Sequence, residues 1–351
     1  MYFTNQWYLI CLTDELKNQN PLEKKILGQE LVVFRTEEGN IHVIENRCCH
    51  RNVKLSLGYV KGGCIKCAYH GWEFNGAGKC VSIPSLEDDQ MIPETARIKS
   101  YPVKIYNHMV WVFIGNPALA DEKNLPPMEE MRDLPYVFNY HWLKADLKLV
   151  AESLIDPYHI DHVHRNSIKT FMGNLSRKQV NFVISADNSC MTGEYYRENR
   201  GSFFEKLYFG FEPEIKTNFG FWFPHTSKLQ INFTSKKRTL YIYEHFYPVE
   251  GDTICMLQIT IWDNIFKGFD AFAKWFMLRK SNKIVEEDIV FLESNKYFQD
   301  NYQVRDLLIK SDKVTIEFSK LWRTNISQYS NEEMVEAEDC EKATALQSRI
   351  K

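Results

Sequence analysis

The sequence has no long hydrophobic run, no excess of one charge and no cationic leader. Its longest apolar stretches, Trp7–Leu12 and Met109–Ile114, are far shorter than the roughly 20 residues that a membrane-spanning helix needs. Lysine and arginine number 43 against 46 aspartates and glutamates, and no dense basic block occurs. This balance does not favour nucleic-acid binding. We therefore expect a cytoplasmic protein with no membrane and no nucleic-acid partner.

Common cofactor motifs are also missing. The sequence contains no HExxH, no glycine-rich phosphate loop and no flavin-type GxGxxG. The chain is therefore predicted to bind no nicotinamide or flavin itself, so electrons for any redox chemistry would come from a partner protein. It does contain nine cysteines, of which Cys48, Cys49, Cys64 and Cys67 are close in sequence. An odd number without a secretory leader indicates a metal site rather than a disulfide framework.

The pattern of turns divides the chain into two parts. The first third has short apolar runs separated by tight turns, such as Val103–Tyr106 and Met109–Ile114, and this pattern predicts an all-β domain. Prolines set among charges between residues 115 and 135 are typical of a linker. We place the domains at 1–117 and 118–351.

The second part is predicted to be α+β. A helix interrupted by Pro157 is expected over Val150–Arg165, and a long helix from about Asp263 to Asn301. Strand composition is found at Phe219–Pro224, Lys228–Phe233, Thr239–Tyr247 and Thr253–Trp262.

Cysteine and histidine alternate in two short segments of the first domain. Cys48-Cys49-His50 and Cys67-Ala68-Tyr69-His70 form C-x-H and C-x-x-H, sixteen residues apart. Two thiolates and two imidazoles could hold zinc, or a [2Fe–2S] cluster with the cysteines on one iron and the histidines on the other. Because the ligand types alternate between loops, we favour the cluster. Cys49 and Cys64 would be buried packing thiols.

The segment Cys67–Trp72 resembles the ring-hydroxylating branch of the Rieske family. This resemblance implies a Rieske-type [2Fe–2S] cluster with Cys48 and Cys67 on the ferric iron, and His50 and His70 on the redox-active iron. Family loops usually carry glycine where this chain has Asn52, a residue that tolerates a left-handed backbone.

A second constellation lies in the segment Glu152–His164. Glu152, Asp156 and His159 fall on one face of a helix at i, i+4 and i+7. Two imidazoles and one carboxylate, with open positions opposite, form the facial triad of iron(II) enzymes that activate dioxygen. Spacing alone allows His159 to pair with His162 or with His164. The alternative, a solvated face with incidental histidines, is disfavoured by the apolar residues between them.

The carboxylate of such a triad is predicted at Asp288. This residue lies three after Val285 and four before Leu292, on the apolar stripe of the long helix. An unpaired charge there would be costly, and a metal ion would remove the cost. Glu286 and Glu287 are predicted to point toward solvent, with Glu287 as the fallback ligand.

The second segment also resembles the ring-hydroxylating oxygenases, in the α-only branch of vanillate demethylase, dicamba demethylase and pheophorbide oxygenase. The resemblance implies a helix-grip-like α+β catalytic domain with a central antiparallel sheet and a mononuclear Fe(II) on His159, His164 and Asp288. His162 becomes a packing or neighbouring residue. Asp156 is the expected catalytic bridge between His159 and His70 of the partner subunit in a head-to-tail homotrimer.

The resulting hypothesis is the oxygenase component of a Rieske non-haem iron system. It would use O2, and electrons from a separate NAD(P)H-dependent reductase or ferredoxin, to hydroxylate or oxidatively demethylate a small aromatic or cyclic substrate. The alternative is a stand-alone Rieske electron-transfer protein without oxygenase chemistry.

Overall fold

The computed structural model describes residues 3–17, 20–87, 89–168, 172–175, 180–203, 206–207, 210–263 and 270–327. The chain divides into two compact units. The first comprises Met1–Leu134 and Tyr247–Cys255, and the second Pro135–Phe246 and Met256–Lys351. The first unit is all-β and the second α+β, which confirms the predicted fold class. No helix among the described residues is long and apolar enough to span a bilayer.

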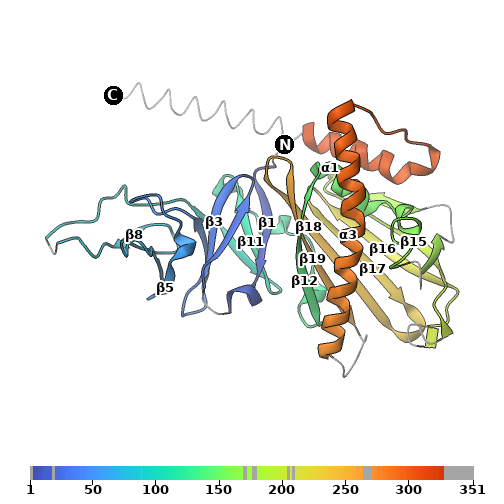
Figure 1. The fold of residues 1–351 in the computed structure, drawn as a ribbon, viewed down its shortest axis with the longest axis horizontal. Coiled ribbons are helices and arrows are strands. Elements are labelled where there is room, and N and C mark those ends of the chain that lie inside the picture. Colours follow the sequence, from blue (N-terminus) through green and yellow to red (C-terminus); the bar gives the residue numbers. More distant parts are fainter. Residues whose placement is uncertain are drawn as a thin grey trace. The chain divides into compact units, whose positions relative to one another are not determined.

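Small antiparallel sheets build the first unit (Figure 1). One contains β1 (Gln6–Leu12), β11 (Met109–Ile114) and β10 (Val103–Tyr106); the next contains β2 (Leu22–Ile26), β3 (Gln29–Arg35), β4 (Ile41–Glu45) and β9 (Ser100–Tyr101); the last contains β5 (Tyr59–Lys61), β6 (Cys64–Lys66), β7 (Glu73–Phe74) and β8 (Cys80–Ser82). The predicted hairpin of β10 and β11 is confirmed, and its turn residues Asn107 and His108 adopt positive φ.

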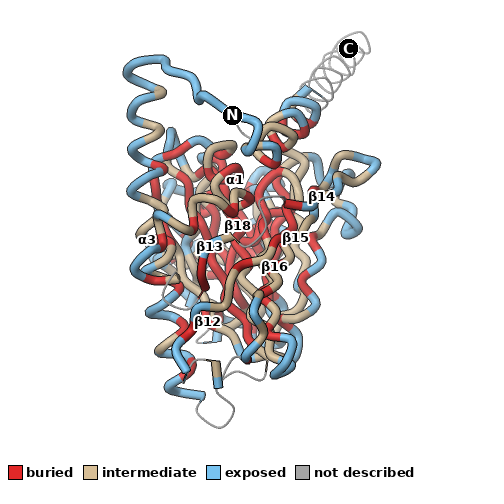
Figure 2. The backbone as a smooth tube through the Cα atoms, turned by 90° about the vertical axis from the view of Figure 1, so that its right-hand side faces the viewer, coloured by how far each residue is buried: buried red, intermediate tan, exposed pale blue. Residues whose placement is uncertain are grey.

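The second unit is built on an antiparallel sheet with the strand order β12-β19-β18-β17-β16-β15-β13, and β14 pairs with β15. These strands are β12 (Tyr136–Lys144), β13 (Met172–Leu175), β14 (Asn181–Ile184), β15 (Cys190–Asn199), β16 (Glu214–Trp222), β17 (Thr226–Phe233), β18 (Arg238–Glu250) and β19 (Thr253–Asp263). All four predicted strands are present, as β16 to β19. Figure 2 shows their buried backbone at the centre of the unit.

The helix predicted over Val150–Arg165 is only partly correct. Helix α1 spans Leu147–Ile155 and ends at Asp156, whose backbone is extended. Pro157 explains this end, because proline disfavours helical geometry in the residue before it and has no N–H to donate. The chain then makes one short 3-10 turn, His159–Asp161. Because of this break, His159 leaves the helix face of Glu152.

The long helix α3 spans Asp270–Tyr302, and residues 264–269 at its expected start lie outside the described residues. Val285 and Leu292 are buried, as predicted. Helical spacing also predicts Phe272 on this apolar stripe, but Phe272 is 51% exposed, so that part of the prediction is wrong. The observed stripe consists of Ala273, Met277, Ser281, Val285 and Leu292. A further helix covers residues 313–327. The capping-box pattern Ser330-Asn331-Glu332-Glu333 predicts one more helix, which lies outside the described residues.

A buried arginine fixes the segment that follows α1. Arg197 of β15 is fully buried, and its guanidinium pairs with Asp161 at 2.5 Å. It also donates to the backbone oxygens of Pro157 and Gly173, the latter at 3.2 Å. One side chain thus ties together both ends of the segment that carries the two site histidines.

We expect Arg197→Met to lower the free energy of unfolding by about 3–5 kcal/mol, because it leaves the Asp161 carboxylate without its buried partner. Denaturant titration of the full chain measures this change. The control is Arg200→Met, which removes an exposed ion pair with Glu198 and should cost below about 1 kcal/mol. Equal effects of the two substitutions would contradict the role given to Arg197.

Candidate metal centres

Two loops of the first unit share one backbone pattern. The Cys48 N–H donates to the Val53 carbonyl at 2.8 Å, and the Asn52 N–H donates back to the Cys48 carbonyl at 2.9 Å. In the second loop, the Cys67 N–H donates to the Trp72 carbonyl at 2.9 Å and the Gly71 N–H to the Cys67 carbonyl at 3.0 Å.

The residues that close these two loops have a left-handed backbone. Asn52 has φ 59° and Gly71 has φ 73°. The expectation that Asn52 takes the place of a glycine is confirmed. Gly58 serves a different purpose, since a Cβ there would lie 1.9 Å from the Lys66 carbonyl oxygen. The backbone at residue 58 can therefore lie this close to the backbone at Lys66 only if residue 58 is glycine.

The thiols and imidazoles of these loops differ in exposure. Cys48 and Cys67 lie in the hydrophobic core, each 2% exposed, whereas His50 and His70 are exposed. The two imidazole rings are 4.8 Å apart, and His50 stacks on Trp72 at 4.5 Å. This arrangement fits a cluster with one buried iron on sulfur and one iron near the surface on nitrogen.

Burial also makes the charged form of these thiols unfavourable. It raises the pKa of the Cys48 thiol to about 11, and the neighbouring Cys67 thiol adds to the shift. A buried thiolate pair is therefore unfavourable unless a metal ion compensates its charge. Cys49 and Cys64 are half-buried free thiols rather than fully buried ones, which corrects that part of the expectation, whereas Cys49 does pack against the hydrophobic core.

In the second unit, His159, His164 and Asp288 come together. One donor atom from each lies within 4.8 Å of the others. The Asp288 Oδ1 atom is 3.2 Å from His164 Nε2 and 3.7 Å from His159 Nε2. Two donors that bind one ion at about 2.1 Å and at right angles lie about 3.0 Å apart. The donor set thus fits one transition-metal ion with three protein ligands.

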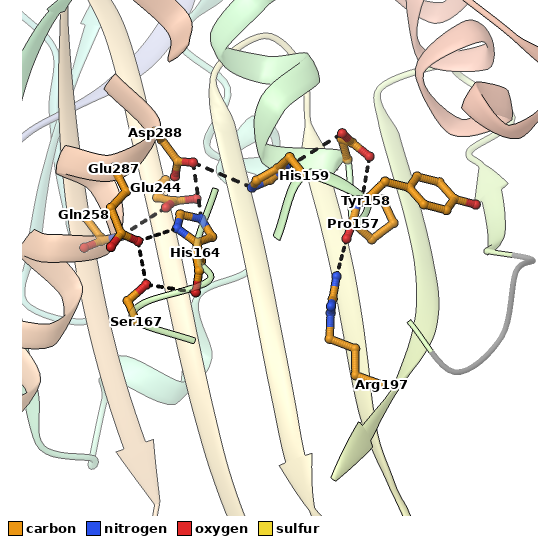
Figure 3. A network of polar contacts seen from close by, with 11 residues as sticks. Pro157, Tyr158, His159, His164, Ser167, Arg197, Glu244, Gln258, Glu287 and Asp288 are labelled. Carbon is orange, nitrogen blue, oxygen red and sulfur yellow. Dashed lines mark hydrogen bonds and ion pairs between the residues drawn. The ribbon is translucent and has the colours of Figure 1, made fainter. Parts of the chain in front are cut away.

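Helix α3 places Asp288 at this point. The residue lies between Val285 and Leu292 of the buried stripe, so its carboxylate is directed into the unit rather than into solvent. The histidines come from the segment after α1, opposite the helix (Figure 3). His162, by contrast, is exposed, which corrects the expectation of a packing residue.

Glu287 is not directed toward solvent, contrary to the prediction. Its Oε2 atom lies 2.9 Å from His164 Nδ1 and accepts a hydrogen bond from Ser167 Oγ at 2.5 Å (Figure 3). Burial opposes the charged form, but the hydrogen bonds from Ser167 and His164 outweigh it, and the pKa of Glu287 is lowered. A carboxylate on Nδ1 makes that nitrogen the donor and leaves Nε2 free to bind a metal.

His159 lies between two carboxylates. Its Nε2 atom faces Asp288, while Nδ1 lies 3.8 Å from Asp156 Oδ2. That Nδ1 atom is buried and makes no hydrogen bond within the described residues. Asp156 also accepts a hydrogen bond from the Tyr158 N–H at 2.8 Å. Glu152, by contrast, is bound by Ser319 Oγ at 2.5 Å and by Lys148, and therefore links α1 to helix 313–327.

The metal site is accessible from two sides. An inner pocket is lined by His159, His164 and Asp288 together with mainly aliphatic side chains. Glu244 and Gln258 also lie on its wall. An outer groove reaches His159 and Asp288 past Asp156. Six aromatic side chains in or beside β16 and β18 do not line the inner pocket. These are Phe221, Trp222, Phe223, Tyr241, Tyr243 and His245.

The sequence matches two protein-family models. The model described as Rieske [2Fe-2S] domain matches residues 6–102, and the one described as Vanillate O-demethylase oxygenase C-terminal domain matches residues 143–326. The first range contains both Cys–His loops, and the second contains the His159, His164 and Asp288 site.

Curated relatives are similar over about half of their own length. The iron-sulfur subunit of the toluene-4-sulfonate monooxygenase system of Comamonas testosteroni is 34% identical over 54% of this chain and 53% of the relative. The 4beta-methylsterol monooxygenase of Methylococcus capsulatus is 35% identical over 46% of this chain and 45% of its own. The dicamba O-demethylase oxygenase component of Stenotrophomonas maltophilia is 33% identical over 48% and 50%.

Solved structures with the same fold include two complexes with a bound small molecule. The crystal structure of dicamba monooxygenase bound to dicamba superposes with a TM-score of 0.76 at 20% identity, over 92% of this chain and 98% of that one. The structure of NdmA from Pseudomonas putida with caffeine has a TM-score of 0.70 at 20% identity, over 90% and 88%.

We expect Glu287→Gln to weaken iron binding at the second site by about 10–100-fold, because the amide no longer fixes the His164 tautomer as a carboxylate does. The measurement is the iron retained against a competing chelator, with the cluster absorbance as an internal reference. Glu286→Gln is the matched control, since Glu286 is exposed on the same turn of α3. If the two variants retain equal iron, Glu287 does not support the site.

Proposed function

Because the chain belongs to the family that joins a Rieske [2Fe-2S] domain to a vanillate O-demethylase oxygenase C-terminal domain, we propose that it is the oxygenase component of a multicomponent redox system. The observation that carries this proposal is the convergence of His159, His164 and Asp288 beside a largely apolar pocket. A stand-alone electron carrier would need neither feature.

In this proposal, each centre is held by residues already described. Cys48, Cys67, His50 and His70 hold the [2Fe–2S] cluster, and His159, His164 and Asp288 hold a mononuclear iron(II). When bound, the cluster supplies single electrons, and the iron(II) offers open positions at which dioxygen is activated. Glu287 keeps the His164 Nε2 lone pair directed at the site, and the aliphatic pocket positions the substrate and excludes water.

The proposed reaction inserts one oxygen atom into a C–H bond of the substrate. The C–H bond breaks and a C–O bond forms, while the second oxygen atom leaves as water after uptake of two electrons and two protons. Since the sequence lacks nicotinamide and flavin motifs, a separate NAD(P)H-dependent reductase or a ferredoxin supplies the electrons. When the oxidised carbon is an O-methyl group, the product collapses to formaldehyde and an alcohol. The substrate is a small cyclic or aromatic molecule, as the names of several relatives suggest for those proteins.

We further propose a head-to-tail homotrimer in the cytoplasm. His50 and His70 are exposed, so a neighbouring molecule can reach the imidazole end of the cluster. The outer groove that leads to Asp156 and His159 is bordered by exposed apolar side chains, including Phe291 and Leu307, the latter 91% exposed. Exposed apolar residues around a polar group are typical of a protein interface. Asp156 would then link His159 to His70 of the partner subunit.

Iron content tests the proposed function directly. The anaerobically prepared, fully loaded chain should contain about three irons, two in the cluster and one on the facial triad. His159→Ala should lose one iron while the reduced cluster keeps its electron-resonance signal. Ala substituted for the exposed His162 is the control and should retain all three. A wild-type chain with only the two cluster irons would be an electron carrier instead.

Subunit mixing tests the electron path across the interface. His70→Ala chains lack a working cluster and His159→Ala chains lack the mononuclear iron, so each is inactive alone. Co-assembled trimers should regain up to about a quarter of wild-type oxygen consumption, because in a head-to-tail ring a good cluster can face a good iron. No recovery in verified mixed trimers would mean that electrons travel within one chain.

The same mixture separates the role of Asp156 from a general effect on folding. Asp156→Asn added to the His70→Ala chain, which holds the working iron, should abolish the recovered activity. The identical substitution added to the His159→Ala chain should have no effect, because its Asp156 has no iron to serve. Equal effects in both chains would rule out the proposed bridge.

A further inference from the structure

Three adjacent strands contribute to a buried polar cluster at the wall of the pocket. Ser227 of β17, Glu244 of β18 and Gln258 of β19 are all buried, and Ser227 and Glu244 are direct partners in the strand register. Ser227 Oγ donates to Glu244 Oε2 at 2.9 Å, and Gln258 Nε2 donates to Glu244 Oε1 at 3.0 Å. We call Ser227, Glu244 and Gln258 the wall cluster.

The wall cluster belongs to the same cavity as the metal site. Glu244 and Gln258 line the pocket together with His159, His164 and Asp288, and Figure 3 shows both beside these residues. Most of the remaining lining is aliphatic, with side chains such as Ile155, Leu229 and Ile242. A substrate in this pocket thus meets hydrocarbon on most sides and a polar group at the wall cluster.

The cluster presents hydrogen-bond acceptors. Its two internal hydrogen bonds, donated by Ser227 and by Gln258, are both accepted by Glu244. The Gln258 Oε1 atom is buried and has no hydrogen-bond partner among the described residues. A buried acceptor without a donor is unfavourable, and a ligand N–H or O–H would satisfy it.

The charges around the pocket disfavour an anionic ligand. Arg197 is the only cationic side chain in the described lining, apart from the histidines, and it is already bound to Asp161 and to the Pro157 carbonyl. The acidic side chains of the lining are Asp156, Glu244 and Asp288. A carboxylate directed at the wall cluster would lose its water and meet no unpaired cationic side chain of the lining there, on the side of the pocket away from the iron ligands.

Building on the proposed function, we propose that the pocket selects an uncharged, mainly apolar substrate whose hydroxyl or amide N–H donates to Gln258 and Glu244. Substrates that would direct a carboxylate or a sulfonate at the wall cluster are rejected. Selection of this kind combines one satisfied polar contact with a penalty on the wrong ligand.

Matched probes test this selectivity without any turnover. 4-Methoxybenzyl alcohol, 4-methoxybenzamide and 4-methoxybenzoate share one skeleton and differ at one polar group. Calorimetric titration of the anaerobic, metal-loaded full chain should show the alcohol and the amide binding at least about tenfold more tightly than the benzoate. Equal or tighter binding of the benzoate overturns the proposal, as does failure of the alcohol to bind at millimolar concentration.

Two substitutions assign the effect to the wall cluster. Gln258→Met keeps the side-chain shape but removes the acceptor, and should weaken alcohol binding about tenfold. Glu244→Gln should reduce the difference in affinity between the alcohol and the benzoate by a similar factor. The control is Glu250→Gln, an exposed position on the same strand, which should leave all three affinities unchanged. An unchanged preference in both wall variants overturns the assignment.

The iron content of each protein separates this proposal from the proposed function. If a chain that holds its mononuclear iron does not bind the alcohol and the amide more tightly than the benzoate, only the proposed substrate selectivity is rejected. A chain without that iron rejects the oxygenase function, whatever the probes show.

Discussion

The second unit depends on the placement of one carboxylate, Asp288, on the buried stripe of α3. An acid at this position is unfavourable unless positive charge or hydrogen-bond donors lie close by. The two imidazoles of His159 and His164 face it at 3.7 and 3.2 Å, and they come from a segment that cannot continue α1 past Pro157. Pro157 thus ends α1 just before the two histidines, so that their imidazoles can face the Asp288 carboxylate.

Support for this arrangement extends well beyond the three side chains. Glu287 fixes one imidazole through Nδ1, and Asp156 lies beside the other. Arg197 of β15 holds the segment that carries the two histidines, through Asp161 and the Gly173 carbonyl. Because these supports come from a helix, a loop and a strand, the geometry of the site is set by the packing of the whole unit rather than by one motif. Such preorganisation is what a three-ligand metal site with open positions requires.

Much of the fold could be read from the sequence, but not its less patterned parts. Strands β16 to β19 are rich in aromatic and β-branched residues and were predicted. Strand β15, in contrast, carries Gly193, Glu194 and Arg197, so its composition hides its place in the sheet. The first three residues of α1, 147–149, were missed because the apolar pattern there begins earlier than the predicted start. Phe272 was misassigned because a large aromatic at helical spacing can face solvent as well as the core.

The candidate site, like the fold, could be predicted from the sequence only in part. Residue type and spacing singled out the Cys–His loops, His159 and Asp288 as candidates, since each breaks the local pattern of its segment. Glu287 could not be placed, because a helix projection puts it away from the stripe, and only the approach of His164 and Ser167 gives it an inward partner. The wall cluster was invisible for a related reason. Its members are seventeen and fourteen residues apart in sequence, and only the strand register brings them together.

The hairpin of β18 and β19 has a consequence for how the protein can be divided. Its tip, Tyr247–Cys255, belongs to the first unit, while its arms carry Glu244 and Gln258 in the second. A shortened chain that stops at Leu134 would therefore lack part of its own core, although it keeps every cluster ligand. The two units are consequently not modules that evolution or an engineer can exchange at a single junction, since any graft must carry the hairpin tip with it.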